Sequence, residues 1–333
     1  MIDKIKGVIY GQALGDAMGM PAELWSRRKG LEICGEITTF LDGPPENVVS
    51  KQYKAGQFTD DTAQAFVILD SLAETNYHPR SIVVAKNILK WAEENNAFEL
   101  NMLGPTSKAT LEAIRDGKDA REISDAALSN GAAMRIAPVG CLFNVNTTDD
   151  LKLLADYVKA VSEGTHSSDI TISSATIIAA TVALAMHTNN TKEAVTRAIE
   201  IEDYALSIGA ETFSPSIKAR VKLGIKYANK YNKNDFLQFV YQVIGAGVNA
   251  SESVPAALLI AYYSKSPLEC ALLCANLGGD TDTIGAMATA ICGGTYGYSA
   301  IPSEYIAMLD KSNNIDFDKY VKIILEGRQI VNE

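Results

Sequence analysis

Residues 7–19 read GVIYGQALGDAMG, a stretch in which glycine recurs every fourth residue, at Gly7, Gly11, Gly15 and Gly19. This spacing places the glycines on one face of an α-helix. Glycine inside a helix costs about 1 kcal/mol relative to alanine, so glycines in register require a compensating contact. We expect that face to meet another helix, or acidic side chains at the helix end, at short distance. Small residues at 285–294 predict a second closely packed helix.

The same helical period dominates the rest of the chain. Apolar residues recur at i, i+3 or i+4 and i+7, whereas the alternating patterns typical of strands are scarce. The expected helices span residues 61–73, 81–95, 106–116, 149–163, 170–187, 191–205, 216–231, 255–263, 267–277 and 283–294, with one short extended piece near 33–41. The chain is therefore predicted to be all-α. No linker rich in proline, glycine or serine divides it, so residues 1–333 are expected to form a single domain.

Composition and charge exclude several classes of protein. A net charge of -10 without clustered Lys or Arg argues against a nucleic-acid-binding surface. The most apolar stretch, Ile170–Met186, is interrupted by Ser and Thr, so we expect a buried core helix rather than a membrane span. The amino terminus lacks the uninterrupted apolar segment of a signal peptide. Five cysteines in apolar settings indicate reduced thiols, and hence a cytoplasmic protein.

Two acidic motifs, T-D-D-T at 59–62 and D-T-D-T at 280–283, each run directly into an apolar helix. A helix cap is the simpler explanation, because Asp and Thr are favoured at helix starts and the first turn stabilises anions. A cap accounts for one such residue, but not for two carboxylates beside two threonines. Adjacent carboxylates near a core repel each other unless a cation compensates them. Because oxygen ligands without histidine or cysteine select Mg²⁺, Mn²⁺ or Ca²⁺ over zinc, we predict a hard-metal site.

Two polar turns lie between these acidic motifs. Residues 129–135 read SNGAAMR, and backbone N–H groups in such a turn can bind a phosphate beside an arginine. Asn-Gly is also an ordinary turn signal, so the motif alone is weak. His166 lies in the second turn, before the helix expected at 170–187. Contact with a substrate is one role for it, although a single histidine at such a place is more often structural.

Taken together, these motifs resemble the ADP-ribosylglycohydrolase family. The resemblance covers most of the chain in the family's order, at residues 11–19 (GQALGDAMG), 58–62 (FTDDT), 130–135 (NGAAMR), 165–167 (THS) and 278–285 (GGDTDTIG). Each motif alone is a modest signal, but their order makes the match specific. The resemblance implies a compact, single-domain orthogonal bundle of many helices with a binuclear Mg²⁺ or Mn²⁺ centre.

The resemblance also implies roles for individual residues. The implied metal ligands are Thr59, Asp60, Asp61, Asp280, Asp282 and Thr283. Catalytic roles are implied for Asp60, Asp61 and Asp282, and for Glu23, which follows the glycine-rich helix and would lie beside the metals. The implied substrate contacts are Ser129, Asn130, Gly131, Met134, His166, Gly278 and Gly279.

Two positions depart from the family's pattern. Ala127, three residues before Asn130, stands where one branch of the family has a catalytic aspartate, and the nearby Asp125 is out of register. We therefore expect a metal-bound aspartate or Glu23 to activate water instead. Phe58 replaces the tryptophan often found before T-D-D-T, which alters the expected pocket wall.

The expected function is metal-dependent hydrolysis of the ribosyl C1″ glycosidic bond of an ADP-ribosylated substrate, either a modified protein or a small molecule. One alternative is hydrolysis of a small nucleoside or another N-glycoside in bacterial catabolism. A second is a catalytically inactive ADP-ribose-binding protein. The intact acidic motifs at 59–62 and 280–283 favour an enzyme, because an abandoned metal site would be free to lose its charges.

Overall fold

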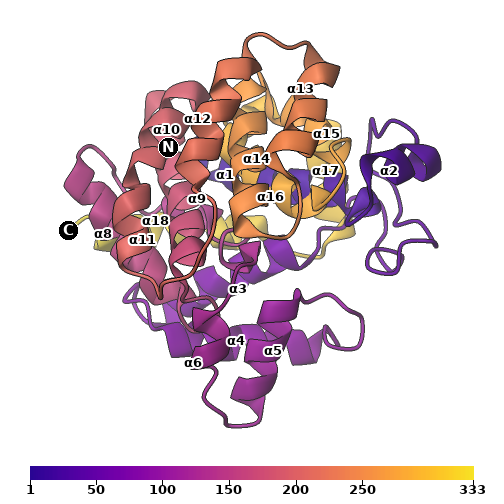
Figure 1. Cartoon of the computed structure of the whole chain (residues 1–333). Helices are drawn as coiled ribbons and strands as arrows, with labels where there is room; N and C mark the ends of the chain where they lie inside the picture. Colours follow the sequence, from indigo (N-terminus) through magenta and orange to yellow (C-terminus); the bar gives the residue numbers. More distant parts are fainter.

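The computed structural model describes all residues from 1 to 333, and its regular structure is helical (Figure 1). The α-helices are α1 (Ile2–Gly19), α2 (Arg27–Cys34), α3 (Asp60–Glu74), α4 (Ser81–Glu94), α5 (Pro105–Arg115), α6 (Arg121–Asp125), α7 (Ala137–Gly140), α8 (Thr148–Ser162), α9 (Asp169–Thr188), α10 (Thr191–Ala198), α11 (Glu202–Ser207), α12 (Ile217–Ala228), α13 (Lys233–Phe239), α14 (Ala250–Tyr263), α15 (Pro267–Ala275), α16 (Thr281–Tyr296), α17 (Ser303–Ser312) and α18 (Phe317–Val331). No sheet forms, and only isolated bridges pair extended residues. The all-α prediction is confirmed.

Helices α1 and α16 pack antiparallel in the middle of the molecule (Figure 1). The glycine face of α1 lies directly on the α16 backbone. A Cβ atom added at any of its glycines would come under 3.0 Å from an α16 backbone atom, in the pairs Gly7 with Gly293, Gly11 with Thr289, Gly15 with Gly285 and Gly19 with Thr281. The predicted close approach of two helices is therefore confirmed, and it explains why alanine is absent from these positions.

Helix α9 runs through the hydrophobic core. By length and composition it is apolar enough to cross a membrane, but 94% of its most apolar window is buried inside the protein. It packs against α8, α10, α14 and α16, and one continuous core extends from α1 to α18. This burial agrees with the core helix expected from the Ser- and Thr-interrupted sequence.

Two of the expected helices have different limits. The segment expected as one helix at 191–205 is divided by a 3₁₀ turn at Ile199–Ile201. Helix α14 begins at Ala250, a full turn before Pro255, where the sequence suggested its start. Proline has no N–H to donate to the carbonyl of Ser251 four residues earlier. Arg220 donates to that carbonyl instead, at 2.6 Å, so the helix continues past the proline.

The extended piece expected near 33–41 is not a strand. Residues 33–34 end α2, and residues 35–59 form an irregular segment at the edge of the molecule (Figure 1). The Asn276 side chain bonds both backbone groups of Ile37, accepting from its N–H at 2.9 Å and donating to its carbonyl at 2.8 Å. A side-chain amide thus takes the place of a partner strand.

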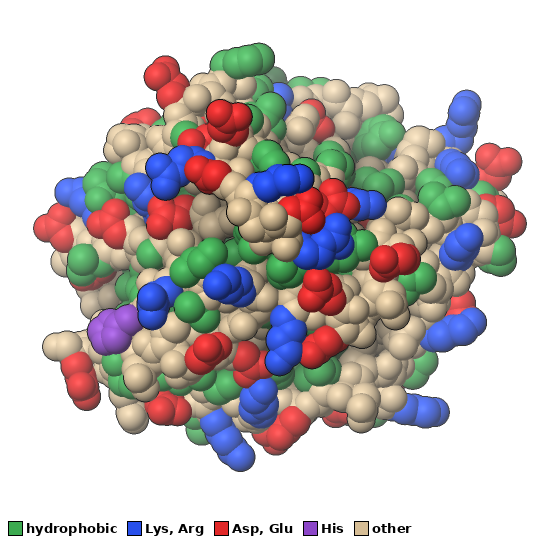
Figure 2. All heavy atoms as spheres, turned by 90° about the horizontal axis from the view of Figure 1, so that it is seen from below, with side chains coloured by type: hydrophobic (Ala, Val, Ile, Leu, Met, Phe, Trp, Pro, Cys, Tyr) green, Lys and Arg blue, Asp and Glu red, His purple; other side chains and the backbone are tan.

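The surface carries charges of both signs. On the face drawn in Figure 2, Lys and Arg side chains are interspersed with Asp and Glu rather than gathered in one basic patch. Charged groups of opposite sign that alternate in this way produce no extended positive field.

Candidate metal centre

Carboxylates from three separate segments of the chain meet in one place. Asp60 and Asp61 begin α3, Asp280 and Asp282 lie at the start of α16, and Glu23 follows α1. One oxygen each of Glu23, Asp280 and Asp282 lies within 4.8 Å of the other two. A single hard cation with oxygen ligands at about 2.1–2.6 Å can contact all three. The structure therefore places Glu23 directly beside two of the predicted metal ligands, Asp280 and Asp282.

The packing of α1 on α16 creates this arrangement. It places the carboxyl end of α1 against the amino end of α16, where Thr281 Oγ1 donates to the Gly19 carbonyl at 2.7 Å. The chain then turns back after α1, and Leu24 N–H donates to the Gly279 carbonyl at 2.7 Å. Glu23 and Asp280 are thus held beside each other by backbone contacts between segments far apart in sequence.

Gly278 and Gly279 form the turn that precedes Asp280. Both have φ of +86°, a backbone conformation that strains other residues. A Cβ at Gly279 would also collide with the carbonyl of Ala246, which accepts a hydrogen bond from Asp280 N–H at 2.7 Å. The two glycines position the α16 terminus, and their predicted contact with substrate stays a prediction.

Asp16 anchors the start of α3, a role that the sequence analysis missed. Its fully buried carboxylate accepts four hydrogen bonds from two threonines: from Thr59 N–H and Oγ1, both at 2.9 Å, and from Thr62 N–H and Oγ1 at 3.1 and 2.6 Å. These bonds hold the T-D-D-T segment against α1. Thr59 Oγ1 also lies 3.1 Å from Asp61 Oδ2 and can donate to it, so Asp16 and Asp61 share one hydroxyl group.

The carboxyl groups of the centre outnumber nearby positive charges. They belong to Asp16, Glu23, Asp60, Asp61, Asp280 and Asp282. Removal from water raises the pKa of each one above its usual range, and in Asp280 the negative charge of Asp61 adds to this effect, giving about 7. Burial raises the pKa of Asp61 to about 6. The rise is limited because hydrogen bonds from Thr283 and Thr59 stabilise the ionised carboxylate. Asp61 Oδ1 and Asp282 Oδ1 are buried without any hydrogen-bond partner.

Arg135 is a buried positive charge close to these carboxylates, and only 2% of its surface is exposed. Its guanidinium donates to Gln64 Oε1 and to Thr165 Oγ1, both at 2.5 Å. Gln64 Nε2 in turn donates to Asp60 Oδ2 at 2.8 Å. Arg135 therefore faces the α3 carboxylates through Gln64, instead of lining a phosphate site as the SNGAAMR turn suggested.

The Asn-Gly turn lies directly against the centre. Asn130 Nδ2 donates to Asp280 Oδ2 at 2.5 Å and to Ser253 Oγ at 2.9 Å. Gly131 packs on the ring of His166, where a Cβ would come under 3.0 Å from Nε2 and Cε1. The carbonyl of Met134 accepts from Gln12 Nε2, which also donates to the carbonyl of Asp61, at 3.0 and 3.2 Å.

His166 is fully buried behind this turn. Its Nε2 lies 3.2 Å from Ser129 Oγ, and its Nδ1 lies 3.0 Å from Thr165 Oγ1. Burial and the positive charge of Arg135 lower the pKa of His166 well below its usual range, so the ring is neutral. The structure thus places Ser129, Gly131 and His166 in mutual contact, while their predicted contact with substrate stays a prediction.

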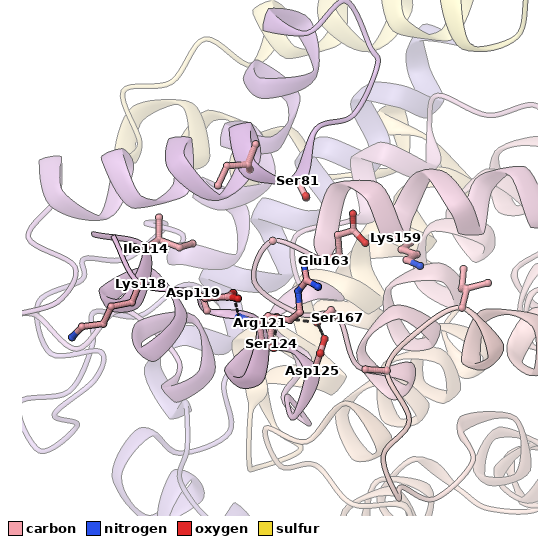
Figure 3. A pocket seen from close by; sticks show the side chains of 15 residues that line it. Ser81, Ile114, Lys118, Asp119, Arg121, Ser124, Asp125, Lys159, Glu163 and Ser167 are labelled. Carbon is pink, nitrogen blue, oxygen red and sulfur yellow. Dashed lines mark hydrogen bonds between the residues drawn. The ribbon is translucent and has the colours of Figure 1, made fainter. Parts of the chain in front are cut away.

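A cavity of about 590 Å³ is lined in part by residues 118–125, which precede this turn in the chain (Figure 3). Asp125 lines it and accepts a hydrogen bond from Ser167 Oγ, an interaction drawn in Figure 3. Ala127, two residues further on, has no carboxylate, and its carbonyl accepts a hydrogen bond from Ser168 Oγ. The lining of this cavity includes none of the carboxylates of the centre, and the expectation that a metal-bound aspartate or Glu23 activates water stays a prediction.

Residues 1–330 match the model of the ADP-ribosylglycohydrolase family, and the carboxylate centre uses the motifs on which the resemblance rested. This chain belongs to the ADP-ribosylglycohydrolase family. Members of this family are glycosyl hydrolases, so the chain is a glycosidase of the ADP-ribosylglycohydrolase type. The family is known to use divalent metals.

The chain is similar to relatives with and without a named activity. The chain is 42% identical to the uncharacterized protein YegU of Escherichia coli K12, over 98% of both chains. It is 23% identical to the ADP-ribosylarginine hydrolase Tri1 of Pseudomonas putida, over 94% of this chain and 76% of that one. It is also 23% identical to human ADP-ribosylhydrolase ARH3, over 91% and 88% of the chains. A solved ADP-ribosylglycohydrolase-related protein complex shares the fold, with a TM-score of 0.71, 21% identity and coverage of 99% and 98%.

Proposed function

We propose that this family member hydrolyses the ribosyl C1″ glycosidic bond of an ADP-ribosylated substrate and requires two Mg²⁺ or Mn²⁺ ions. The observation that carries the proposal is the excess of buried carboxylate around Glu23, Asp61 and Asp282, two of which have an oxygen without a hydrogen-bond partner. Buried carboxylates without partners are unfavourable unless a cation binds them or they take up protons.

The donor set fits a hard divalent cation. Every candidate ligand is an oxygen, because the centre contains no cysteine and the ring of His166 turns to Ser129 and Thr165. Such a set favours Mg²⁺ or Mn²⁺ over zinc. In this proposal the ligands are Thr59, Asp60, Asp61, Asp280, Asp282 and Thr283, together with Glu23. Bound ions of this kind polarise substrate oxygens and lower the pKa of water.

The side chains divide by exposure into two groups. Asp61 and Asp282 are each 2% exposed, which suits them to hold cations but not to exchange protons with solvent. Glu23 and Asp60 are partly exposed. Loss of surrounding water raises their pKa values, and the negative charges of the neighbouring carboxylates raise them further. We assign to these two the proton transfer that activates water, and to the remaining carboxylates the stabilisation of the positive ribosyl centre that forms as the leaving group departs.

A turnover screen tests the proposal. Purified protein is incubated with ADP-ribosyl-arginine, ADP-ribosyl-serine and free nucleosides, with Mg²⁺, Mn²⁺ or a chelator. Release of ADP-ribose that stops with the chelator is the expected result. Turnover of nucleosides alone would replace the proposed substrate class, and ADP-ribose binding without any turnover would identify an inactive binding protein.

Variants connect the activity to the centre. Asp280→Asn and Asp60→Asn are expected to lose Mn²⁺ binding and turnover together, while the exposed Asp149→Asn retains both. A folded Asp280→Asn protein with normal Mn²⁺ affinity and turnover contradicts the assignment. Free thiols at all five cysteines are compatible with the cytoplasmic location that we also propose.

A further inference from the structure

One buried polar group beside the carboxylates has no partner and no role so far. The Tyr53 side chain is 9% exposed, and its hydroxyl is buried without any hydrogen-bond partner. A buried hydroxyl left without a partner costs about 1–3 kcal/mol, which makes such groups rare in folded proteins. An orphan hydroxyl at the edge of a binding centre is therefore a sign of a partner supplied by a ligand.

The negative charges that act on the Tyr53 hydroxyl belong to the carboxylate centre, so the hydroxyl lies near it. Besides burial, the negative charges of Asp60 and Glu23, and then of Asp16 and Asp282, raise the pKa of Tyr53 above its usual range. All four belong to the carboxylate centre, yet none of them accepts a hydrogen bond from the phenol. The phenol therefore stays protonated and presents an unused O–H donor to that centre.

The backbone around Tyr53 holds the ring in place. Tyr53 N–H donates to the Ser50 carbonyl at 2.9 Å, and the Tyr53 carbonyl accepts from Gly43 N–H at 3.0 Å. Within the loop so closed, Asn47 Nδ2 donates to the Glu23 carbonyl at 2.9 Å. One compact loop thus carries Tyr53 and also restrains the backbone of Glu23, so the two residues are held in the same part of the molecule.

We propose that the Tyr53 hydroxyl donates a hydrogen bond to an oxygen of the substrate's ribosyl group when that group lies at the carboxylate centre. This inference rests on the proposed function, which places a ribosyl group there. Ionised carboxylates accept hydrogen bonds and cannot donate them. A neutral donor among them therefore favours a ligand with both hydroxyl groups and ring oxygens. Tyr53 is a substrate-binding residue in this scheme, and it transfers no proton.

Calorimetric titration with ADP-ribose and with AMP, in Mg²⁺, tests the inference on the full-length protein. Tyr53→Phe retains the ring and removes only the hydroxyl. We expect it to bind ADP-ribose about fivefold to tenfold more weakly than the wild type, the effect of one neutral hydrogen bond. Its affinity for AMP, which lacks the distal ribose, should not change.

Thermal unfolding without ligand separates binding from a structural role. Because the hydroxyl is unpaired in the free protein, Tyr53→Phe is expected to keep or raise the unfolding midpoint. The matched control is Tyr77→Phe, whose hydroxyl donates to the Ile323 carbonyl at 2.9 Å. That control should lower the midpoint and leave ADP-ribose affinity unchanged.

Three results would overturn the inference, and each can be told from the others. If the wild type binds ADP-ribose and Tyr53→Phe binds it equally well, the Tyr53 contact is wrong while the proposed function stands. If the wild type binds no ADP-ribose, the proposed function fails and the Tyr53 contact fails with it. A lower unfolding midpoint with unchanged ADP-ribose affinity would assign the hydroxyl to a structural water instead.

Discussion

Asn130 Nδ2 lies 2.5 Å from Oδ2 of Asp280, although 150 residues separate the two in the chain. The turn that the sequence suggested for phosphate binding therefore supports a carboxylate of the candidate metal centre directly. A donor in this position orients the Asp280 carboxylate and leaves its other oxygen available for a cation.

Asn130→Ala should weaken metal binding. Without the amide, Asp280 loses the donor that orients it, and such losses typically reduce metal affinity by about 10- to 100-fold. Titration calorimetry with Mn²⁺ measures the effect. Asn95→Ala is the matched control, because Asn95 is exposed and bonds only its own helix, through the Trp91 carbonyl. Equal Mn²⁺ affinity in both variants would show that Asn130 does not support the ligand.

The metal-free protein should become less stable as the pH rises. In the folded state the pKa values of Asp61, Asp280 and Asp16 are about 6, 7 and 8, each above the value of about 3.9 for an unfolded aspartate. A raised pKa means that the folded protein holds its protons more tightly, so the resulting stabilisation is complete below pH 4 and is lost as the pH passes 6 to 8.

Thermal unfolding between pH 5 and pH 9 tests this dependence on chelated protein. The midpoint should fall across that interval, and saturating Mn²⁺ should reduce the fall, because the cation binds the ionised carboxylates. Asp280→Asn should flatten the profile of the chelated protein. A chelated wild type whose midpoint is constant from pH 5 to pH 9 is incompatible with the raised pKa values.

Gly15→Ala should destabilise the protein even though alanine is the better helix former. Its Cβ would meet the backbone carbonyl of Gly285, which cannot move away without separating α1 from α16. Overpacking of this kind costs about 1–3 kcal/mol in the free energy of unfolding. Urea denaturation measures the change.

Gly30→Ala is the control for that substitution. Gly30 also lies in a helix, α2, but a Cβ there meets only the Ala22 side chain, at an ordinary 3.5 Å. It should stabilise the protein by up to about 1 kcal/mol, the difference in helix propensity. If both variants shifted the urea midpoint in the same direction, the α1–α16 contact would not be the reason for the glycine.

Arg135→Lys should be destabilising despite the retained charge. A lysine ammonium cannot bridge Gln64 and Thr165 as the planar guanidinium does, so one of the two buried acceptors loses its donor. The expected loss is about 1–3 kcal/mol in the free energy of unfolding. The control is Arg197→Lys, because Arg197 is exposed and pairs with Glu193 at i,i+4. Urea denaturation should show a loss of less than about 0.5 kcal/mol in its free energy of unfolding. Similar losses in the two variants would argue against a buried Arg135 network.

Much of the fold could be predicted because helices are encoded by the local spacing of apolar and small residues. Helical periodicity located most helices to within a few residues, and the glycine spacing of 7–19 predicted a helix contact at short distance. Pattern reasoning missed α2 and short helices such as α6 and α7, where the apolar period is brief. It missed α17 and α18 as well, although apolar residues at 317, 320, 321 and 324 repeat with helical spacing. It also misread residues 33–41, because the Asn276 amide that satisfies Ile37 lies far away in the sequence.

The carboxylate centre was also predicted only in part. The T-D-D-T and D-T-D-T motifs identified the carboxylates of α3 and α16 without any coordinates. Asp16 and Gln64 gave a signal that was available but not used, since each is a polar residue between two small residues of a helix, Gly15 and Ala17 or Ala63 and Ala65. Asn47 gave no such signal, because it acts on a backbone carbonyl from within an irregular loop.

The sequence by itself determined that this protein is all-α, that the glycine face at 7–19 needs a close neighbour, and that two acidic motifs stand at helix starts. Only the tertiary structure decided that α16 is this neighbour along its whole length and that Glu23 joins Asp280 and Asp282 within 4.8 Å. It also decided that Arg135 turns inward to Gln64. Helices can be predicted from the sequence because the spacing of apolar residues lies within one segment of the chain. The partner of a buried charge cannot, because it depends on which distant segments pack together.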